Sequence, residues 1–230
     1  MNIFQFLFKS SLGRKYIMAV TGGALVVFVI GHMIGNLSFL LGREQINAYG
    51  HFLHTKTELL WASRIGLLVM IALHIWSAIA LSAANKAARP VGYAVQKPHG
   101  SSYASRTMLM SGLIIFCFIV YHLLHFTVQA PAVNLTGKDF GTLIDSEGRR
   151  DIYSMVVLGF SRPAIAIFYM VGVGLLSLHL SHGVSSLFQS LGLRSKGYAP
   201  LIKCAGTLLA IVLIIGYWSI PLSVLTGLKK

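Results

Sequence analysis

The stretch KYIMAVTGGALVVFVIGHMIGNLSFLL, residues 15–41, is long and apolar enough to cross a bilayer as a helix. Beyond Lys15 at its edge, the only side chain in it that titrates near neutral pH is His32. An imidazole surrounded by hydrocarbon needs a partner, because an unpaired polar group inside a membrane is costly. The stretch therefore predicts a transmembrane helix that carries a functional histidine.

The whole chain of 230 residues has the composition of an integral membrane protein. It is 55% hydrophobic and only 11% charged, with a mean hydropathy of +0.73, whereas soluble domains are about 25% charged. No cleavable signal peptide is expected, because the first apolar stretch is too long for one. Apolar windows of helix length predict an all-α, single-domain fold over residues 1–230 with five transmembrane helices, at approximately residues 16–41, 59–84, 107–130, 161–188 and 202–226.

The connections between these windows differ in charge. Segments 85–106 and 189–203 contain Lys and Arg but no acid, whereas segments 42–58 and 131–160 hold all the acidic residues. Lys and Arg alone number ten on the side of the N-terminus and nine on the other. An excess of Lys and Arg favours the cytoplasmic side, so we expect a bacterial inner-membrane protein with its N-terminus in the cytoplasm and its C-terminus outside. The amphipathic residues 1–14 are expected in the membrane interface. The net charge of +13 is then explained by membrane edges and lipid contact rather than by nucleic acid.

Cysteine and histidine are the candidate metal ligands in these windows. Cys117 and Cys204 lie in apolar runs, and we expect buried core residues rather than a disulfide or thiolate ligands. Histidines, in contrast, recur in four of the five windows. They are His32 in the first, His74 in the second, His122 and His125 in the third, and His179 and His182 in the fourth.

Depth along each helix sorts these histidines into pairs. A helix rises about 1.5 Å per residue, so the distance from a basic flank estimates depth in the membrane. His32 and His122 fall at one level in the outer half. His74 and His179 fall at a second level nearer the cytoplasm, on the order of 10 Å away. The pattern predicts a four-helix bundle that encloses two stacked haems, each with two axial histidines. The chain has no C-x-x-C-H motif for covalent attachment, so the haems are expected to be of the b type.

Spacing alone does not choose between neighbouring histidines. His125 lies three residues after His122, and His182 lies three residues after His179, so each shares a helix face with its neighbour. The histidine that is not a ligand would bond a haem propionate, a quinone or a backbone carbonyl. A hydrogen-bonded core histidine without any cofactor is the alternative for each position.

Several segments together resemble the dihaem cytochrome b subunit that anchors succinate:quinone oxidoreductases, the succinate dehydrogenases and fumarate reductases. They are RKYIMAVTGG (14–23), HMIGNLSF (32–39), IALHIW (71–76), the Ser111-Gly112 pair with Tyr121-His122, and HLSHGVSSLFQSLG (179–192). The resemblance covers essentially the whole chain and its five-helix layout. It implies His32, His74, His122 and His179 as the axial ligands. His122 is selected over His125 by its place ten residues after the small-Gly pair, and His179 over His182 by Gly183 four residues on.

The resemblance also implies a function. Such an anchor holds a flavoprotein with covalent FAD and an iron–sulfur protein on the cytoplasmic face, and the dicarboxylate active site lies on the flavoprotein. The anchor itself passes electrons through two haem b groups to or from a membrane quinone, menaquinone or ubiquinone. The fumarate reductase branch can carry a glutamate near the fourth-helix ligand, where this chain has Ser177 and no acid. We therefore expect the succinate-oxidising direction.

Haem propionates and quinone need polar partners near the ends of the windows. Arg64 and Arg162 are expected at the outer haem, and Arg106 and Lys97 at the inner one, with ordinary snorkelling as the alternative. His125 and His182 join them as second partners. An outer quinone site is expected at Tyr49, His51, His54 and Glu58, and an inner one around Ser101, Ser102 and Arg106 is the alternative.

Two other functions compete with this one. One is the membrane cytochrome b of a different dehydrogenase or of a hydrogenase, which would share the haems and bind a different soluble module. A histidine-based metal or proton transporter is the third. A transporter would be expected to place carboxylates beside the histidines, and no Asp or Glu lies inside any window.

Overall fold

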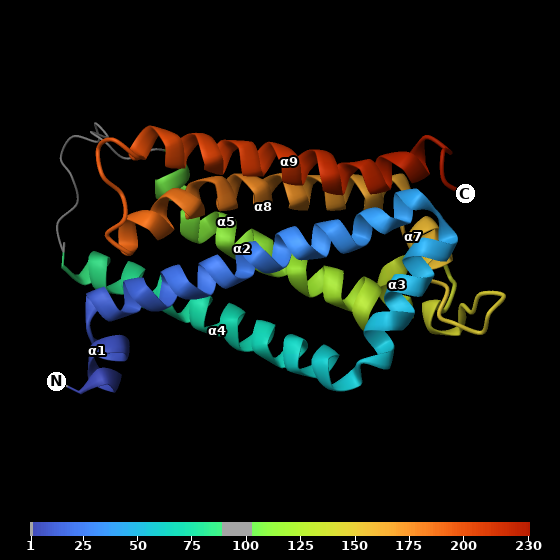
Figure 1. The fold of residues 1–230 in the computed structure, drawn as a ribbon, viewed down its shortest axis with the longest axis horizontal. Coiled ribbons are helices and arrows are strands. Elements are labelled where there is room, and N and C mark those ends of the chain that lie inside the picture. Colours follow the sequence, from blue (N-terminus) through green and yellow to red (C-terminus); the bar gives the residue numbers. More distant parts are fainter. Residues whose placement is uncertain (1, 89–102) are drawn as a thin grey trace. The chain divides into compact units, whose positions relative to one another are not determined.

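The computed structural model describes residues 2–88 and 103–230, which are almost entirely helical (Figure 1). The long helices carry most of these residues, and short helices and turns fill two of the connections. In chain order they are α1 (Ile3–Lys9), α2 (Ser11–Leu41), α3 (Arg43–Thr55), α4 (Thr57–Ala87), α5 (Tyr103–His122), the π-helical turn η1 (Leu123–Thr127), α6 (Pro131–Asn134), the 3-10 turn η2 (Phe140–Thr142), α7 (Ile152–Phe160), α8 (Pro163–Ser190) and α9 (Ala199–Leu225).

Five helical segments are long and apolar enough to cross a membrane. They are α2, α4, Arg106–Thr127 within α5 and η1, α8 and α9. The five predicted windows and the all-helical class of the described residues are thereby confirmed. Apolar side chains are widely exposed on these segments, as Val27, Leu68 and Ile215 show, which suits helices with faces toward lipid.

The prediction that both cysteines are buried was wrong. Cys117 on α5 and Cys204 on α9 are exposed. An apolar run in a soluble protein marks the core, but a membrane helix has apolar residues on its lipid-facing side as well. An apolar run therefore predicts a membrane helix, but it does not predict which residues of that helix face lipid and which face the protein interior.

The two acidic connections also contain helices that hydropathy did not predict. Gly42, with a φ of +128°, turns the chain from α2 into α3, in a region of conformation that favours glycine. α7 has nine residues, roughly 14 Å of helix, and is too short to cross a membrane. α3 and α7 lie side by side (Figure 1), so the connections form a folded cap rather than open loops.

Contacts divide the chain into two compact units, and all five long helices contribute to both. Unit 1 comprises residues 1–28, 64–113 and 178–210, and unit 2 comprises residues 29–63, 114–177 and 211–230. His74 and His179 belong to unit 1, and His32 and His122 belong to unit 2. Each unit thus holds one of the two predicted histidine pairs.

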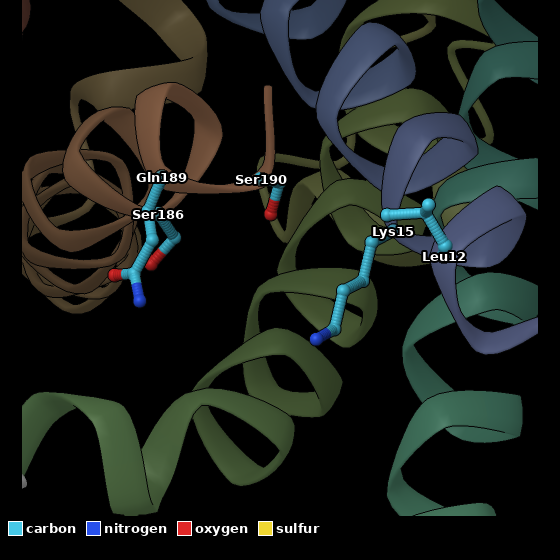
Figure 2. Close-up of a pocket in the computed structure, with 5 residues that line it drawn as sticks. All are labelled: Leu12, Lys15, Ser186, Gln189 and Ser190. Atoms are coloured by element: carbon cyan, nitrogen blue, oxygen red, sulfur yellow. The ribbon is translucent and has the colours of Figure 1, made fainter. Parts of the chain in front are cut away.

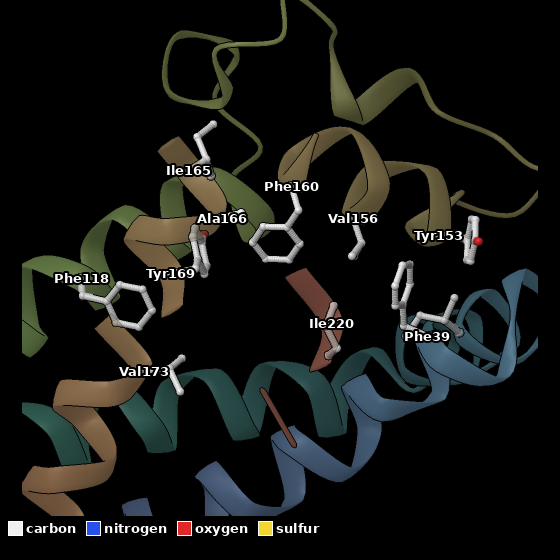
Figure 3. Close-up of a cluster of buried hydrophobic side chains, with 11 residues drawn as sticks. Phe39, Phe118, Tyr153, Val156, Phe160, Ile165, Ala166, Tyr169, Val173 and Ile220 are labelled. Atoms are coloured by element: carbon white, nitrogen blue, oxygen red, sulfur yellow. The ribbon is translucent and has the colours of Figure 1, made fainter. Parts of the chain in front are cut away.

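The core of unit 2 is a cluster of aromatic and branched side chains (Figure 3). Phe39 of α2 stacks on Tyr153 of α7, with ring centroids 5.0 Å apart. Phe160 of α7 meets Tyr169 of α8 edge-on, with centroids 5.1 Å apart. Aromatic side chains bury large areas and favour these geometries. The cluster therefore fixes α7 against α2 and α8.

An ion-pair network joins the segment before α7 to α3 in unit 2. The Arg149 guanidinium donates to the two carboxylate oxygens of Glu44 at 2.9 and 2.7 Å, and to Asp145 at 2.8 Å. Burial disfavours the charged carboxyl of Asp145, but hydrogen bonds from Arg149 and Asn47 outweigh it and lower its pKa to about 2. The carboxylates of this network are therefore ionised at neutral pH.

Candidate functional site

The predicted histidine pair of unit 1 consists of His74 on α4 and His179 on α8. A hydroxyl meets the Nδ1 atom of each ring. Thr21 Oγ1 on α2 lies 3.2 Å from Nδ1 of His74, and Ser111 Oγ on α5 lies 3.0 Å from Nδ1 of His179. With Nδ1 engaged, Nε2 is the ring nitrogen available to a metal.

A glycine lies against each ring of the unit 1 pair. A Cβ atom at Gly22 would lie 3.1 Å from Cε1 of His74, and one at Gly112 would lie 3.6 Å from Cε1 of His179. Each glycine follows directly the residue whose hydroxyl meets the same imidazole. A hydroxyl and a glycine therefore form the same two-residue seat for each histidine.

The histidine pair of unit 2 is formed by His32 on α2 and His122 at the end of α5. Their ring centroids are 5.8 Å apart and their planes cross at 79°. Two imidazoles bound to opposite sides of one metal ion, with metal–nitrogen bonds of about 2 Å, would have centroids roughly 6 Å apart. The separation of His32 and His122 therefore fits a shared metal centre such as haem iron.

The surroundings of the unit 2 pair are largely aromatic. His122 lies between Phe118 and Phe126, with centroid separations of 6.4 and 6.0 Å. The amide Nδ2 of Asn36, one turn after His32, lies 3.3 Å from the His32 ring nitrogens. The ring of Tyr217 on α9 is 6.3 Å from that of His32. Both His32 and His122 are half-buried among these side chains.

His125 is completely buried in unit 2. Its Nδ1 atom lies 3.0 Å from the Tyr169 hydroxyl, and its ring stacks on Phe126 with centroids 4.0 Å apart. Among the described residues, Nε2 of His125 has no hydrogen-bond partner. The π-helical turn η1 begins directly after His122, and such turns are frequent at functional sites. Hydropathy and spacing give no signal for this turn.

The residues predicted near haem propionates are distributed over both units. Arg106 begins its span, Arg162 directly precedes the span that begins at Pro163, and both are exposed. Arg64 on α4 and His182 on α8 are half-buried. Lys97 lies outside the described residues, as do Ser101 and Ser102 of the alternative quinone site. Their predicted roles stay predictions.

The four residues predicted for the outer quinone site are all exposed in unit 2, on α3 and at the start of α4. The ring of Tyr49 lies against Gly35. A Cβ atom added at Gly35 would lie 2.7 Å from the Tyr49 ring carbons Cε1 and Cζ. Glu58 lines a hollow of about 340 Å³ with residues 55–57 and 59. Of the four predicted residues, Glu58 alone lines this hollow, and the outer quinone site stays a prediction.

A larger hollow in unit 1, of about 380 Å³, was not predicted (Figure 2). It is lined by Leu12 and Lys15 of α2 and by Ser186, Gln189 and Ser190 of α8. An ammonium group, an amide and two hydroxyls suit a carbonyl or anionic head group. The polar run Ser185-Ser186 to Gln189-Ser190 at the end of an apolar helix was the available signal in the sequence.

Within residues 2–88 and 103–230, no three His, Cys, Asp or Glu side chains gather as a metal-binding group, so the donors at these sites are pairs. Two imidazoles are the protein ligands of a bis-histidine haem, whose porphyrin supplies the remaining four. No protein-family model, curated protein or solved structure matches the chain.

Proposed function

We propose that this membrane protein is the dihaem cytochrome b subunit that anchors a succinate:quinone oxidoreductase. In this role it passes electrons between an iron–sulfur partner in the cytoplasm and a quinone in the membrane. The dicarboxylate chemistry belongs to a flavoprotein partner that carries FAD.

One observation supports the proposal above all. Each unit contains a pair of histidines from two different membrane-length helices. The five spans hold a single acidic side chain, Glu58 in the first turn of α4, far along the helix from His74. The unit 2 pair has the separation of two imidazoles on one metal ion. The unit 1 pair has both Nδ1 atoms bonded to hydroxyls, which leaves Nε2 of His74 and His179 for iron.

The chain's own residues would hold each haem in a dry, fixed place. His32 and His122 would ligate one iron and His74 and His179 the other, and a bound haem supplies reversible one-electron chemistry. Aromatic side chains around His122 would exclude water from the bound haem, and low dielectric around iron is one of the means by which proteins tune its potential. Arg64 and Arg162, and Arg106 with Lys97, are proposed for the propionates.

The partner proteins are proposed to bind at the basic connection between α8 and α9. Segment 189–203 carries Arg194, Lys196 and Lys203 without an acid, and such a surface suits acidic partner proteins on the cytoplasmic face. The hollow between Lys15 and Gln189 offers an inner quinone site, and Tyr49 and Glu58 belong to the proposed outer one. In either place the polar groups would hydrogen-bond a quinone carbonyl.

A pyridine haemochrome assay with reduced-minus-oxidised spectra tests the proposal on the purified chain. We expect two b-type haems per chain, with His32→Ala and His179→Ala each losing a different one. Leu178→Ala is the matched control, since its side chain is exposed next to His179, and it should retain both haems. A folded wild-type chain without haem would refute the proposal.

Purification of the intact complex distinguishes the redox alternatives. Co-purification with a subunit that carries covalent flavin and oxidises succinate is the expected result. A different soluble module on the same two haems would instead identify the anchor of another dehydrogenase or of a hydrogenase.

A further inference from the structure

The seats of His74 and His179 follow the same pattern on two different helices. Thr21-Gly22 on α2 meets His74, and Ser111-Gly112 on α5 meets His179. Both hydroxyls lie in unit 1 with the rings that they contact. All four contacts therefore belong to one compact body.

The hydroxyl protons decide the direction of these hydrogen bonds. Thr21 Oγ1 donates to the Ile17 carbonyl at 2.7 Å, and Ser111 Oγ donates to the Met108 carbonyl at 3.0 Å. A hydroxyl has a single proton, so toward the imidazole each oxygen acts as an acceptor. In this arrangement His74 and His179 donate from Nδ1–H, and the lone pair of each ring is on Nε2.

We propose that Thr21 and Ser111 are positioning residues that hold His74 and His179 as the Nδ1–H tautomers and set the reduction potential of the haem bound between them. This inference rests on the proposed function. A ligating histidine that donates its other N–H to an acceptor has its orientation fixed and its basicity raised. A more basic ligand favours the oxidised iron, so these hydroxyls lower the potential of the unit 1 haem.

The test removes the hydroxyl oxygen of Thr21 or Ser111 with a substitution that keeps the side chain close to its original size. Thr21→Val and Ser111→Ala delete one acceptor each, and the double variant deletes both. Thr21→Ser and Ser111→Thr keep the hydroxyl. Thr207→Val is the matched control, because the Thr207 hydroxyl on α9 donates to the carbonyl of Lys203 and is exposed.

Potentiometric titration of each haem gives the first measurement. Each single deletion should change the reduced-to-oxidised ratio of the unit 1 haem about tenfold in favour of reduction, or about 59 mV for one electron. The double variant should show about twice that shift. The unit 2 haem, the hydroxyl-retaining variants and Thr207→Val should keep the wild-type potential. Selective loss of the unit 1 haem in the deletion variants alone would also support the positioning role.

A second measurement does not require haem. Nitrogen-15 spectra of labelled histidine in the haem-free chain report the tautomer of each ring, and His74 and His179 should be Nδ1–H in the wild type. Thr21→Val should release that preference at His74 alone. An unchanged potential, or tautomers that do not respond to the deletions, would overturn this inference. A chain that keeps the tautomers but binds no haem would refute the proposed function instead.

Discussion

Asn47→Ala is the substitution that should most affect the cap on unit 2. Asn47 on α3 is completely buried. Its Nδ2 donates to Asp145 and Asp151 at 3.1 Å each, and its Oδ1 accepts from the Tyr153 N–H at 3.0 Å. One side chain thus serves two carboxylates and one of the backbone amides that the first turn of α7 leaves without a helical partner.

The size of the effect follows from these three bonds. A neutral hydrogen bond contributes about 1 kcal/mol and one to a charged group about 1.5–3 kcal/mol, which gives about 4 kcal/mol if all three are lost at the lower values. Arg149 still pairs with Asp145, and Arg43 with Asp151, so part of the cost is recovered. We expect a net loss of about 3 kcal/mol, or about a hundredfold in the opening equilibrium.

Hydrogen exchange read by mass spectrometry in lipid nanodiscs measures that opening directly. Amides of α7 should exchange about a hundredfold faster in Asn47→Ala than in the wild type. Gln45→Ala, at an exposed position on the same helix, is the control and should exchange at the wild-type rate. If α7 exchange in Asn47→Ala rises less than threefold, the hydrogen bonds of Asn47 do not hold the cap and the reasoning is refuted.

Two further predictions concern the cap and the packing of unit 1. The pKa of Asp145 is lowered to about 2 from about 3.9 in unfolded chains. The stability that the ionised Asp145 gives the folded cap is therefore complete above pH 4 and is lost as the pH falls through 2. Hydrogen exchange of the α7 amides, corrected for its intrinsic pH dependence, should lose protection over that interval. Gly206→Ala should destabilise the chain by about 1–3 kcal/mol, because a Cβ there would lie 2.5 Å from the Ser181 carbonyl oxygen. Thermal denaturation in detergent should show a lower midpoint for Gly206→Ala and no loss for Gly66→Ala, where a Cβ meets open space.

Hydropathy was sufficient to predict the five long helices, because a helix of membrane length needs about twenty apolar residues whatever it packs against. Hydropathy did not predict the short helices α3 and α7. α7 is as apolar as the spans but only nine residues long, and α3 is amphipathic and polar enough to resemble a loop. Their positions depend on contacts such as Asn47 with Tyr153, which join residues far apart in sequence.

The candidate site was predictable to a similar degree. Helical rise placed His32 level with His122, and the structure has these rings 5.8 Å apart; their role as ligands stays a prediction. The acceptors of His74 and His179 were not predicted, because a hydroxyl beside a glycine is common in membrane helices. Only the fold shows which imidazole a given hydroxyl meets. The burial of His125 beside η1 was hidden for the same reason, since no residue pattern marks a π-helical turn.

The register of two helices connects the two histidine pairs. His32 follows Thr21 by eleven residues on α2, and His122 follows Ser111 by eleven residues on α5. At 3.6 residues per turn, roughly three turns separate each hydroxyl from its histidine, so the two side chains leave nearly the same helix face. A single inserted residue between them would rotate one by about 100° relative to the other. Each of these helices therefore carries a hydroxyl that contacts one imidazole and, eleven residues later, a histidine of the unit 2 pair, so an insertion between the two positions would turn one of them away from the helix face that it shares with the other.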